Sequence, residues 1–204
     1  MTTDLTEAKA ALRKAAYAAR KSAHAGDADG RARAAADHLL TAMHSFGALR
    51  TEVIVAGYRP IRTEISPDPA LERLAEEGIP LAMPVVEGAG RPLSFRPWSP
   101  GAAEIEGAFG ARIPADETPV TPTALIVPLV AFDGDRWRLG YGGGFYDRTL
   151  AMLRADNPDL VAIGLAYAMQ QVEAVPREAT DRQLDAIATE RGVLRRGVEI
   201  GHGA

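Results

Sequence analysis

The chain has 204 residues, of which 47% are hydrophobic and 25% are charged, as in an ordinary globular domain that buries its own core. It contains no cysteine, which excludes a disulfide framework, a cysteine-ligated zinc site and a cysteine nucleophile, and which suits a reducing compartment. The formal net charge is −4, which argues weakly against nucleic acid as the main partner.

The hydrophobic stretches are too short for membrane insertion. The longest apolar run, 124–132, falls far below the roughly 20 residues that a membrane-spanning helix needs. The opening residues alternate alanine with charged residues and lack the apolar core of a signal peptide. We therefore expect a cytoplasmic monomer that acts on a small molecule and contacts neither membrane nor nucleic acid.

The amino-terminal part of the chain predicts two helices. Residues 6–23 are rich in alanine with lysine and arginine interspersed, a composition of high helix propensity. Gly26 and Gly30 interrupt the pattern, and a second helix is expected over 31–46, where apolar residues recur at helical spacing. The basic residues of the first helix, Arg20 among them, are interpreted as a solvent-exposed face.

Short apolar runs alternate with helical segments along the rest of the chain. The runs rich in β-branched residues predict strands, and Asp133-Gly134-Asp135 predicts a hairpin turn. This alternation predicts an α/β fold of one domain, a layered and mostly parallel sheet flanked by helices. Strands are expected at 52–58, 79–86, 93–98, 123–132, 136–139, 160–166 and 186–189, helices at 67–77 and 145–155, and mostly loop at 100–122.

A glycine-rich turn follows the strand predicted at 136–139 and precedes the helix predicted at 145–155. Glycines stand at 140, 142, 143 and 144, so the backbone can turn its N–H groups toward a ligand at the positive end of a helix dipole. The segment matches neither the Walker pattern nor the dinucleotide-binding pattern. Its composition alone leaves two alternatives, an anion-binding loop and a plain tight turn.

Charged residues flank this turn. Asp147 lies where a carboxylate can hold Mg²⁺ against bound phosphates, or where it simply favours the helix dipole. Arg138 and Arg148 bracket the turn, and both can neutralise charge that develops during phosphoryl transfer.

The segment Arg138-Leu-Gly-Tyr-Gly-Gly-Gly-Phe-Tyr-Asp-Arg148 closely resembles the signature of 5-formyltetrahydrofolate cyclo-ligases, also called methenyltetrahydrofolate synthetases. The resemblance extends over most of the chain. Further segments that resemble parts of this family, in the same order, are 9–13, 58–64, 109–114 and 181–192. Each short segment is a weak signal, and their order and spacing together are specific.

The resemblance implies roles for individual residues. It implies Mg²⁺ binding by Asp147 and Asp185. Because they bracket the turn, Arg138 and Arg148 are expected to be the catalytic residues that neutralise charge. The residues expected to contact ATP are Lys9, Arg13, Arg138, Leu139, Gly140, Tyr141, Gly142, Gly143, Gly144, Phe145 and Tyr146. Those expected to bind the folate are Arg59, Glu64, Tyr141 and Phe145.

The activity implied by the resemblance is the ATP- and Mg²⁺-dependent conversion of 5-formyltetrahydrofolate to 5,10-methenyltetrahydrofolate, with release of ADP and phosphate. Some members of the family carry basic residues inside the loop, where this chain has Tyr141 and Gly143. Two alternatives stay open on the residues alone. One is a folate- or nucleotide-binding protein without turnover, and the other is a sugar-phosphate or acyl-CoA enzyme of similar fold.

Overall fold

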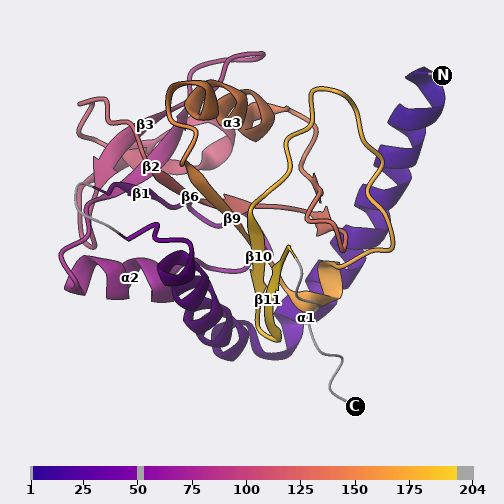
Figure 1. The fold of residues 1–204 in the computed structure, drawn as a ribbon, viewed down its shortest axis with the longest axis horizontal. Coiled ribbons are helices and arrows are strands. Elements are labelled where there is room, and N and C mark those ends of the chain that lie inside the picture. The colour runs from indigo at the N-terminus through magenta and orange to yellow at the C-terminus, as the bar shows by residue number, and fades with distance from the viewer. Residues whose placement is uncertain (1, 50–52, 197–204) are drawn as a thin grey trace.

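The computed structural model describes residues 2–49 and 53–196, and its centre is a seven-stranded sheet in the order β11-β10-β9-β6-β1-β2-β3 (Figure 1). Neighbours from β10 to β2 pair in parallel, and the edge strands β3 and β11 pair antiparallel. The predicted α/β fold with a mostly parallel sheet is confirmed. The strands are β1 Val55–Ala56, β2 Leu81–Val86, β3 Leu93–Trp98, β6 Ala124–Pro128, β9 Val161–Leu165, β10 Ala186–Thr189 and β11 Gly192–Arg195.

Helices cover both faces of the sheet, which is why its central strands are apolar on both sides. The carboxy-terminal half of α1 (Thr2–Ser45) and α2 (Asp68–Glu76) lie on one face, and α3 (Phe145–Asp156) lies on the other (Figure 1). Two separate apolar clusters result. Leu39 and Leu71 belong to the first, and Leu150 belongs to the second.

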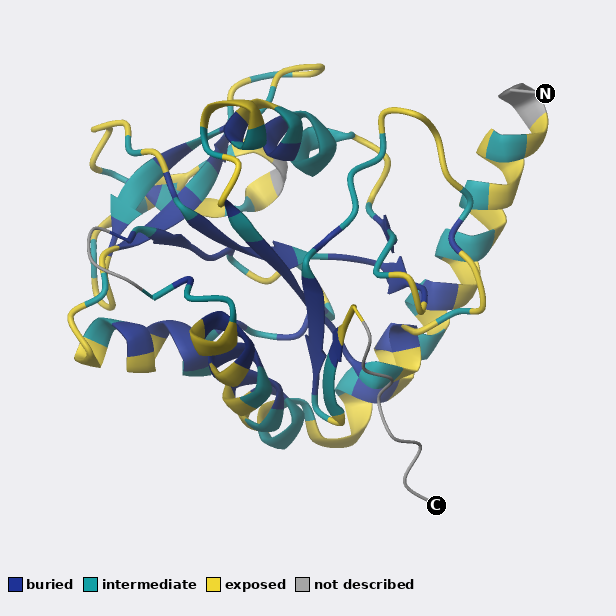
Figure 2. Ribbon diagram, viewed as in Figure 1, coloured by how far each residue is buried: buried dark blue, intermediate teal, exposed yellow. Residues whose placement is uncertain are grey.

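Helix α1 bends where a gap between two helices is predicted. Asp27 takes non-helical backbone angles (φ −147°, ψ 80°), and its Oδ1 accepts a hydrogen bond of 2.9 Å from the Gly30 amide. A carboxylate that accepts such an amide caps the start of the second half. Before the bend the helix runs along the side of the molecule, and it is far more exposed than the half beneath the sheet (Figure 2).

Two small hairpins complete the structure. The predicted turn at Asp133 is confirmed, and it joins β7 (Ala131–Phe132) to β8 (Arg138–Leu139). The region 100–122 contains more structure than the expected loop, namely β4 (Glu104–Glu106), β5 (Arg112–Pro114) and a short 3-10 helix, Ala108–Gly110, between them. Another 3-10 helix spans Ala168–Gln170.

The predicted strand and helix positions largely agree with the structure. The run predicted as one strand at 123–132 divides into β6 and β7, and the first predicted strand shortens to β1. Residue 52, where that prediction begins, lies outside the described residues. No helix within residues 2–49 and 53–196 has the length and apolar character to cross a membrane.

Candidate active site

A cavity of about 750 Å³ opens between segments from across the chain. They include the first half of α1, the loop after β1, parts of β2 and β3, residues 108–112, the glycine loop before α3, and the segment before β10. Basic side chains in its lining include Lys9, Arg13, Arg59, Arg62, Arg112 and Arg138, and the acidic ones are Glu64, Asp147, Glu178 and Asp181. Tyr58, Met83, Val86, Leu93, Leu139 and Phe145 provide much of the apolar wall. One cavity therefore offers both charged and flat apolar surfaces.

The glycine loop forms one wall of this cavity and leads directly into α3. Gly142 and Gly144 adopt positive φ values of 106° and 65°, which side-chain-bearing residues rarely adopt. Arg13 lies against the loop, and its Nε donates to the Gly140 carbonyl at 2.8 Å. Its guanidinium nitrogen lies 3.3 Å from the position that a Cβ at Gly142 would take. Glycine is required here both for the backbone turn and for this close approach.

Arg138 binds Asp147 within the cavity wall. Its Nη2 donates to Asp147 Oδ1 at 2.9 Å, and the Arg182 amide donates to the same oxygen at 2.9 Å. The Arg138 side chain is buried, and burial lowers its pKa while the neighbouring Asp147 carboxylate opposes that shift. Arg138 therefore stays cationic and sets the direction of Asp147 rather than pointing freely into the cavity.

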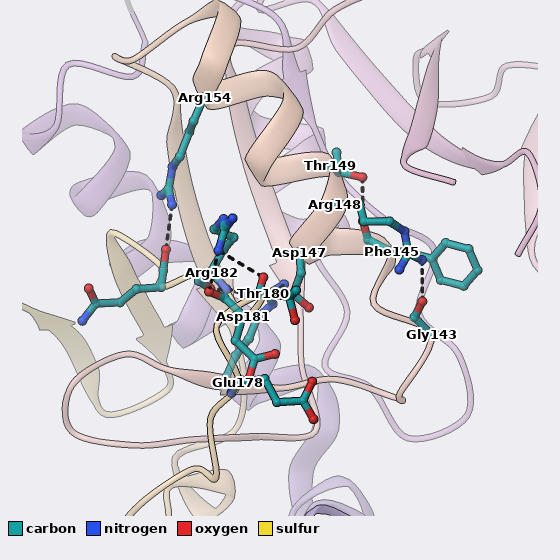
Figure 3. Close-up of polar contacts among 12 residues, drawn as sticks. Gly143, Phe145, Asp147, Arg148, Thr149, Arg154, Glu178, Thr180, Asp181 and Arg182 are labelled. Atoms are coloured by element: carbon teal, nitrogen blue, oxygen red, sulfur yellow. Dashed lines mark hydrogen bonds and ion pairs between the residues drawn. The ribbon is translucent and has the colours of Figure 1, made fainter. Parts of the chain in front are cut away.

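Asp181 is a cavity carboxylate that the sequence analysis missed. Its Oδ2 accepts hydrogen bonds from Lys9 Nζ at 2.9 Å and from the Glu178 amide at 2.7 Å. Because the next residue, Arg182, donates its amide to Asp147, Asp181 lies beside Asp147 (Figure 3). Asp181 is the first residue of the segment 181–192, which resembles the family, and this position could have identified it. The resemblance pointed to Asp185 instead.

The structure does not bring Asp185 to Asp147, and the predicted pair is corrected. Asp185 lies outside the cavity lining, immediately before β10. Its Oδ2 accepts from Arg154 Nη2 at 2.8 Å and from the Ala162 amide at 2.7 Å. These contacts join α3, β9 and β10, so the carboxylate is used in fixing the sheet to a helix.

Arg148 is also placed differently from its predicted role. It is absent from the cavity lining, and its guanidinium donates to the Gly143 carbonyl and, at 3.3 Å, to the Arg91 carbonyl. It lies 5.4 Å from the centre of the Phe145 ring (Figure 3). Arg148 holds the outer side of the glycine loop, whereas Lys9 and Arg13 are among the basic side chains that line the cavity.

Glu64 lines the cavity and is 5% exposed. Its Oε2 accepts from the Ile61 amide at 2.7 Å, and its Oε1 accepts from the Tyr141 hydroxyl at 2.6 Å. Burial raises the pKa of Glu64, while these two hydrogen bonds and the Arg20 charge oppose the rise. Nearby, the Nε of Arg59 donates to Glu104 at 2.8 Å and its guanidinium covers the Trp98 ring at 4.7 Å.

Residues 5–190 match the model of the 5-formyltetrahydrofolate cyclo-ligase family. That span includes every residue of the cavity lining. The chain belongs to this family. The predicted membership is thus confirmed, and the glycine loop, the cavity and Glu64 lie in the part of the chain that defines it.

Individual members of the family and solved structures agree with this assignment. The 5-formyltetrahydrofolate cyclo-ligase of Escherichia coli K12 is 34% identical over 142 residues, 66% of this chain and 76% of that protein. The one from Haemophilus influenzae is 54% identical over 57 residues, 28% of this chain and 29% of that protein. The structure of a 5,10-methenyltetrahydrofolate synthetase from Aquifex aeolicus has a TM-score of 0.71 at 32% identity and covers 95% of this chain and 96% of its own.

A further solved structure supports the fold alone. A 5,10-methenyltetrahydrofolate synthetase from Mycoplasma pneumoniae gives a TM-score of 0.69 at 24% identity, covering 89% of this chain and 98% of its own. The arrangement of sheet and helices is therefore shared even where the sequences have diverged strongly.

Proposed function

We propose that this protein closes the ring of 5-formyltetrahydrofolate to give 5,10-methenyltetrahydrofolate, using ATP and Mg²⁺. The observation that carries the proposal is that one cavity joins a phosphate-type loop to a buried carboxylate. The glycine loop, Asp147 and Glu64 all line this cavity, and Tyr141 contacts Glu64 from within the loop. A nucleotide held by the glycine loop would therefore lie beside a ligand held by Glu64.

The part of the cavity formed by the glycine loop and the first half of α1 suits a triphosphate. Amides of a glycine loop at a helix start attract anions, and α3 begins directly after Gly144. Lys9 and Arg13 bring two cations to the same wall from one face of α1. These residues compensate for the absence of basic side chains inside the loop itself.

Asp147 and Asp181 are the residues that would hold Mg²⁺. The contacts described above use Oδ1 of Asp147 and Oδ2 of Asp181. In residues 2–49 and 53–196 no cluster of three or more metal-binding side chains occurs. Two carboxylates suit Mg²⁺ that arrives with a nucleotide, because this ion usually combines one or two carboxylates with water and phosphate oxygens. When bound, the cation would reduce the negative charge on the phosphates.

The part of the cavity around Glu64 suits the pterin ring. An ionised carboxylate accepts two parallel N–H donors, and Glu64 offers this group among apolar walls that match a flat heterocycle. Phe145 and Arg59 line the same cavity and would contact the ring and the remainder of the folate.

The reaction then follows from positioning. The formyl oxygen on N5 attacks the γ-phosphorus, the new P–O bond forms and ADP leaves. N10 attacks the activated formyl carbon and releases its proton to solvent, the carbon–oxygen bond breaks and inorganic phosphate leaves. The protein contributes mainly by holding both ligands in line and by balancing charge through Lys9 and Arg13.

A coupled assay tests this function. Purified protein is mixed with ATP, Mg²⁺ and 5-formyltetrahydrofolate, and the near-ultraviolet absorbance of the methenyl product is followed together with ADP release. We expect equal amounts of product and ADP, and we expect Asp147→Ala to lower the rate by at least about a hundredfold with an unchanged circular dichroism spectrum.

The outcomes separate the alternatives. Folate binding without product would indicate a non-catalytic binder, and ADP release independent of the folate would indicate a different phosphoryl acceptor. Full activity of Asp147→Ala would remove Asp147 from the cation site.

A further inference from the structure

Arg20 is a buried charge that the function described above does not use. It lies in the alanine-rich first half of α1 and is 1% exposed, against the expectation of a solvent-exposed face. Its Nη1 donates to the Tyr141 hydroxyl at 2.7 Å and lies 3.8 Å from Glu64 Oε1. Its Nε donates to Thr63 Oγ1 at 3.1 Å. The guanidinium thus contacts both the glycine loop and the loop that carries Glu64.

Aromatic rings enclose the guanidinium. Its central carbon lies 5.4 Å from the ring centre of Tyr17 and 5.5 Å from that of Tyr141. Such rings favour a cation over their faces, and they keep water away from it. Burying a guanidinium is costly unless it is paired, and an arginine cannot escape the cost by losing its proton. A residue placed this way acts on its partners at every pH at which the protein functions.

We propose that Arg20 is a positioning residue for Glu64, which it holds ionised and directed into the cavity, both by its own charge and through the Tyr141 hydroxyl. The Tyr141 hydroxyl accepts a hydrogen bond from Arg20 and donates one to Glu64, so the three groups form one chain of hydrogen bonds. The inference rests on the proposed role of Glu64 in binding the folate. It adds a residue of α1 that decides whether that carboxylate can accept N–H donors.

The electrostatic surroundings of Glu64 give the direction of the effect. Burial is the largest influence and raises the pKa of Glu64, whereas the Tyr141 hydrogen bond, the Ile61 amide and, as the smallest of these influences, the Arg20 charge lower it. Removing the Arg20 charge therefore raises that pKa further and protonates Glu64 at a higher pH. The groups that face Glu64 are the Arg20 guanidinium from α1, the phenols of Tyr58 after β1, Tyr141 in the glycine loop and Tyr146 in α3, and the Ile61 amide.

The direction in which activity should change with pH follows from the pKa of Glu64. Glu64 binds the folate in its ionised form, so activity falls as the pH falls through its pKa. With the pKa raised by the loss of Arg20, activity falls at a higher pH and returns when the pH is raised. An opposite charge within about 4–6 Å shifts a carboxyl pKa by about 1–3 units.

The test is steady-state kinetics of the full chain over a range of pH. For Arg20→Met we expect the acidic limb of kcat/KM for 5-formyltetrahydrofolate to move up by about one pH unit. At a pH well below the pKa of Glu64 the KM for the folate should rise about tenfold, while the KM for ATP changes less than about twofold. Lys21→Met, an exposed neighbour that also loses one positive charge, is the matched control and should behave as the wild type.

Two further variants keep the test decisive if Arg20→Met folds poorly. Arg20→Lys retains the charge without the fork of donors, so the acidic limb should stay in place while the folate KM rises. Tyr141→Phe removes one hydroxyl and its hydrogen bond to Glu64 but leaves the Arg20 guanidinium in place. The acidic limb of kcat/KM should therefore move to higher pH. Circular dichroism of each variant confirms that the measured protein is folded.

A double-mutant cycle separates this inference from the proposed function. Glu64→Gln should weaken folate binding. Adding Arg20→Met should then weaken it little further, because both substitutions remove the same interaction. If Glu64→Gln leaves the folate KM unchanged, the proposed role of Glu64 is wrong. If Glu64→Gln has its effect but Arg20→Met leaves the pH limb unmoved, or lowers kcat alone, the positioning role is wrong.

Discussion

Carboxylates that look alike in the sequence have different tasks in the fold. Asp147 and Asp181 line the cavity and are bound by Arg138 and Lys9, whereas Asp185 lies outside it and is bound by Arg154. All three have a cationic partner, so their position relative to the cavity is what distinguishes them. Burial has the same deciding role for the arginines, since the buried Arg20 contacts Glu64 while the partly exposed Arg148 holds the loop from outside.

Asp181→Asn should therefore affect activity, and Asp185→Asn should affect stability. The first should lower the rate about ten- to a hundredfold and raise the Mg²⁺ concentration needed for half-maximal activity, with little change in stability. The second replaces the charged partner of Arg154 with a neutral side chain that can still accept a hydrogen bond, and it should cost no more than about 1 kcal/mol, because the Asp185 side chain is 34% exposed. Thermal denaturation and a Mg²⁺ titration measure the two effects. A normal Mg²⁺ requirement in Asp181→Asn would contradict the cation site.

Gly142→Ala should weaken nucleotide binding. The φ of 106° strains any residue with a side chain, and the new Cβ would press on Arg13. We expect the Kd for ATP to rise about tenfold, from about 1–2 kcal/mol of strain and displacement. Gly101→Ala is the matched control, since Gly101 has a φ of 82°, open space around it and no place in the cavity lining. Equal ATP affinity in both variants would contradict the close fit of the loop.

At the scale of elements, the bend in α1 divides the helix into two halves with different roles. The second half packs beneath the sheet in the apolar core, and the first half carries Lys9, Arg13 and Arg20 toward the cavity at helical spacings of four and seven residues. Residues at these spacings share one face of a helix. Asp27 fixes the angle between the halves and so places the basic face over the glycine loop.

Lys9→Met should accordingly weaken ATP binding while leaving folate binding unchanged. The Lys9 ammonium is held 2.9 Å from Asp181 in the cavity wall, whereas Lys14 is exposed on the same helix. Calorimetric titration with ATP and Mg²⁺ should show a Kd that rises about tenfold for Lys9→Met and hardly changes for Lys14→Met. An equal loss in the two variants would mean that only the overall charge of α1 matters.

At the scale of the whole molecule, the cavity is a property of the assembled layers. Its walls come from segments near both ends of the described chain, so no single segment forms it. The same packing keeps Glu64 buried and the glycine loop at the surface, and Tyr141 bridges the two environments.

Ligands should therefore stabilise the entire fold. A ligand that binds only the folded state at a concentration of 100 times its Kd adds about 2.7 kcal/mol. A non-hydrolysable ATP analogue with Mg²⁺, and 5-formyltetrahydrofolate, should each raise Tm, and together they should raise it more than either alone. Differential scanning fluorimetry provides the measurement. The absence of any shift with the analogue would argue against nucleotide binding at the loop.

The sequence alone determined the α/β class, most strand and helix positions, and the glycine loop. These features depend on local patterns, such as apolar runs between helical segments and glycines between a strand and a helix. The order of the resembling segments also pointed to the family, to Glu64 and to Asp147. Such properties belong to residues close together in the chain, so a linear pattern carries them.

Only the tertiary structure decided which distant groups meet. The pairing of β9 with β10 brought the Ala162 amide to Asp185 and occupied that carboxylate, while the segment before β10 brought Asp181 beside Asp147. The packing of α1 against two loops buried Arg20, although an alanine-rich helix with basic residues predicts exposure. Whether a charge faces solvent, a ligand or another charge depends on the partners that folding supplies, and spacing along the chain does not contain that information.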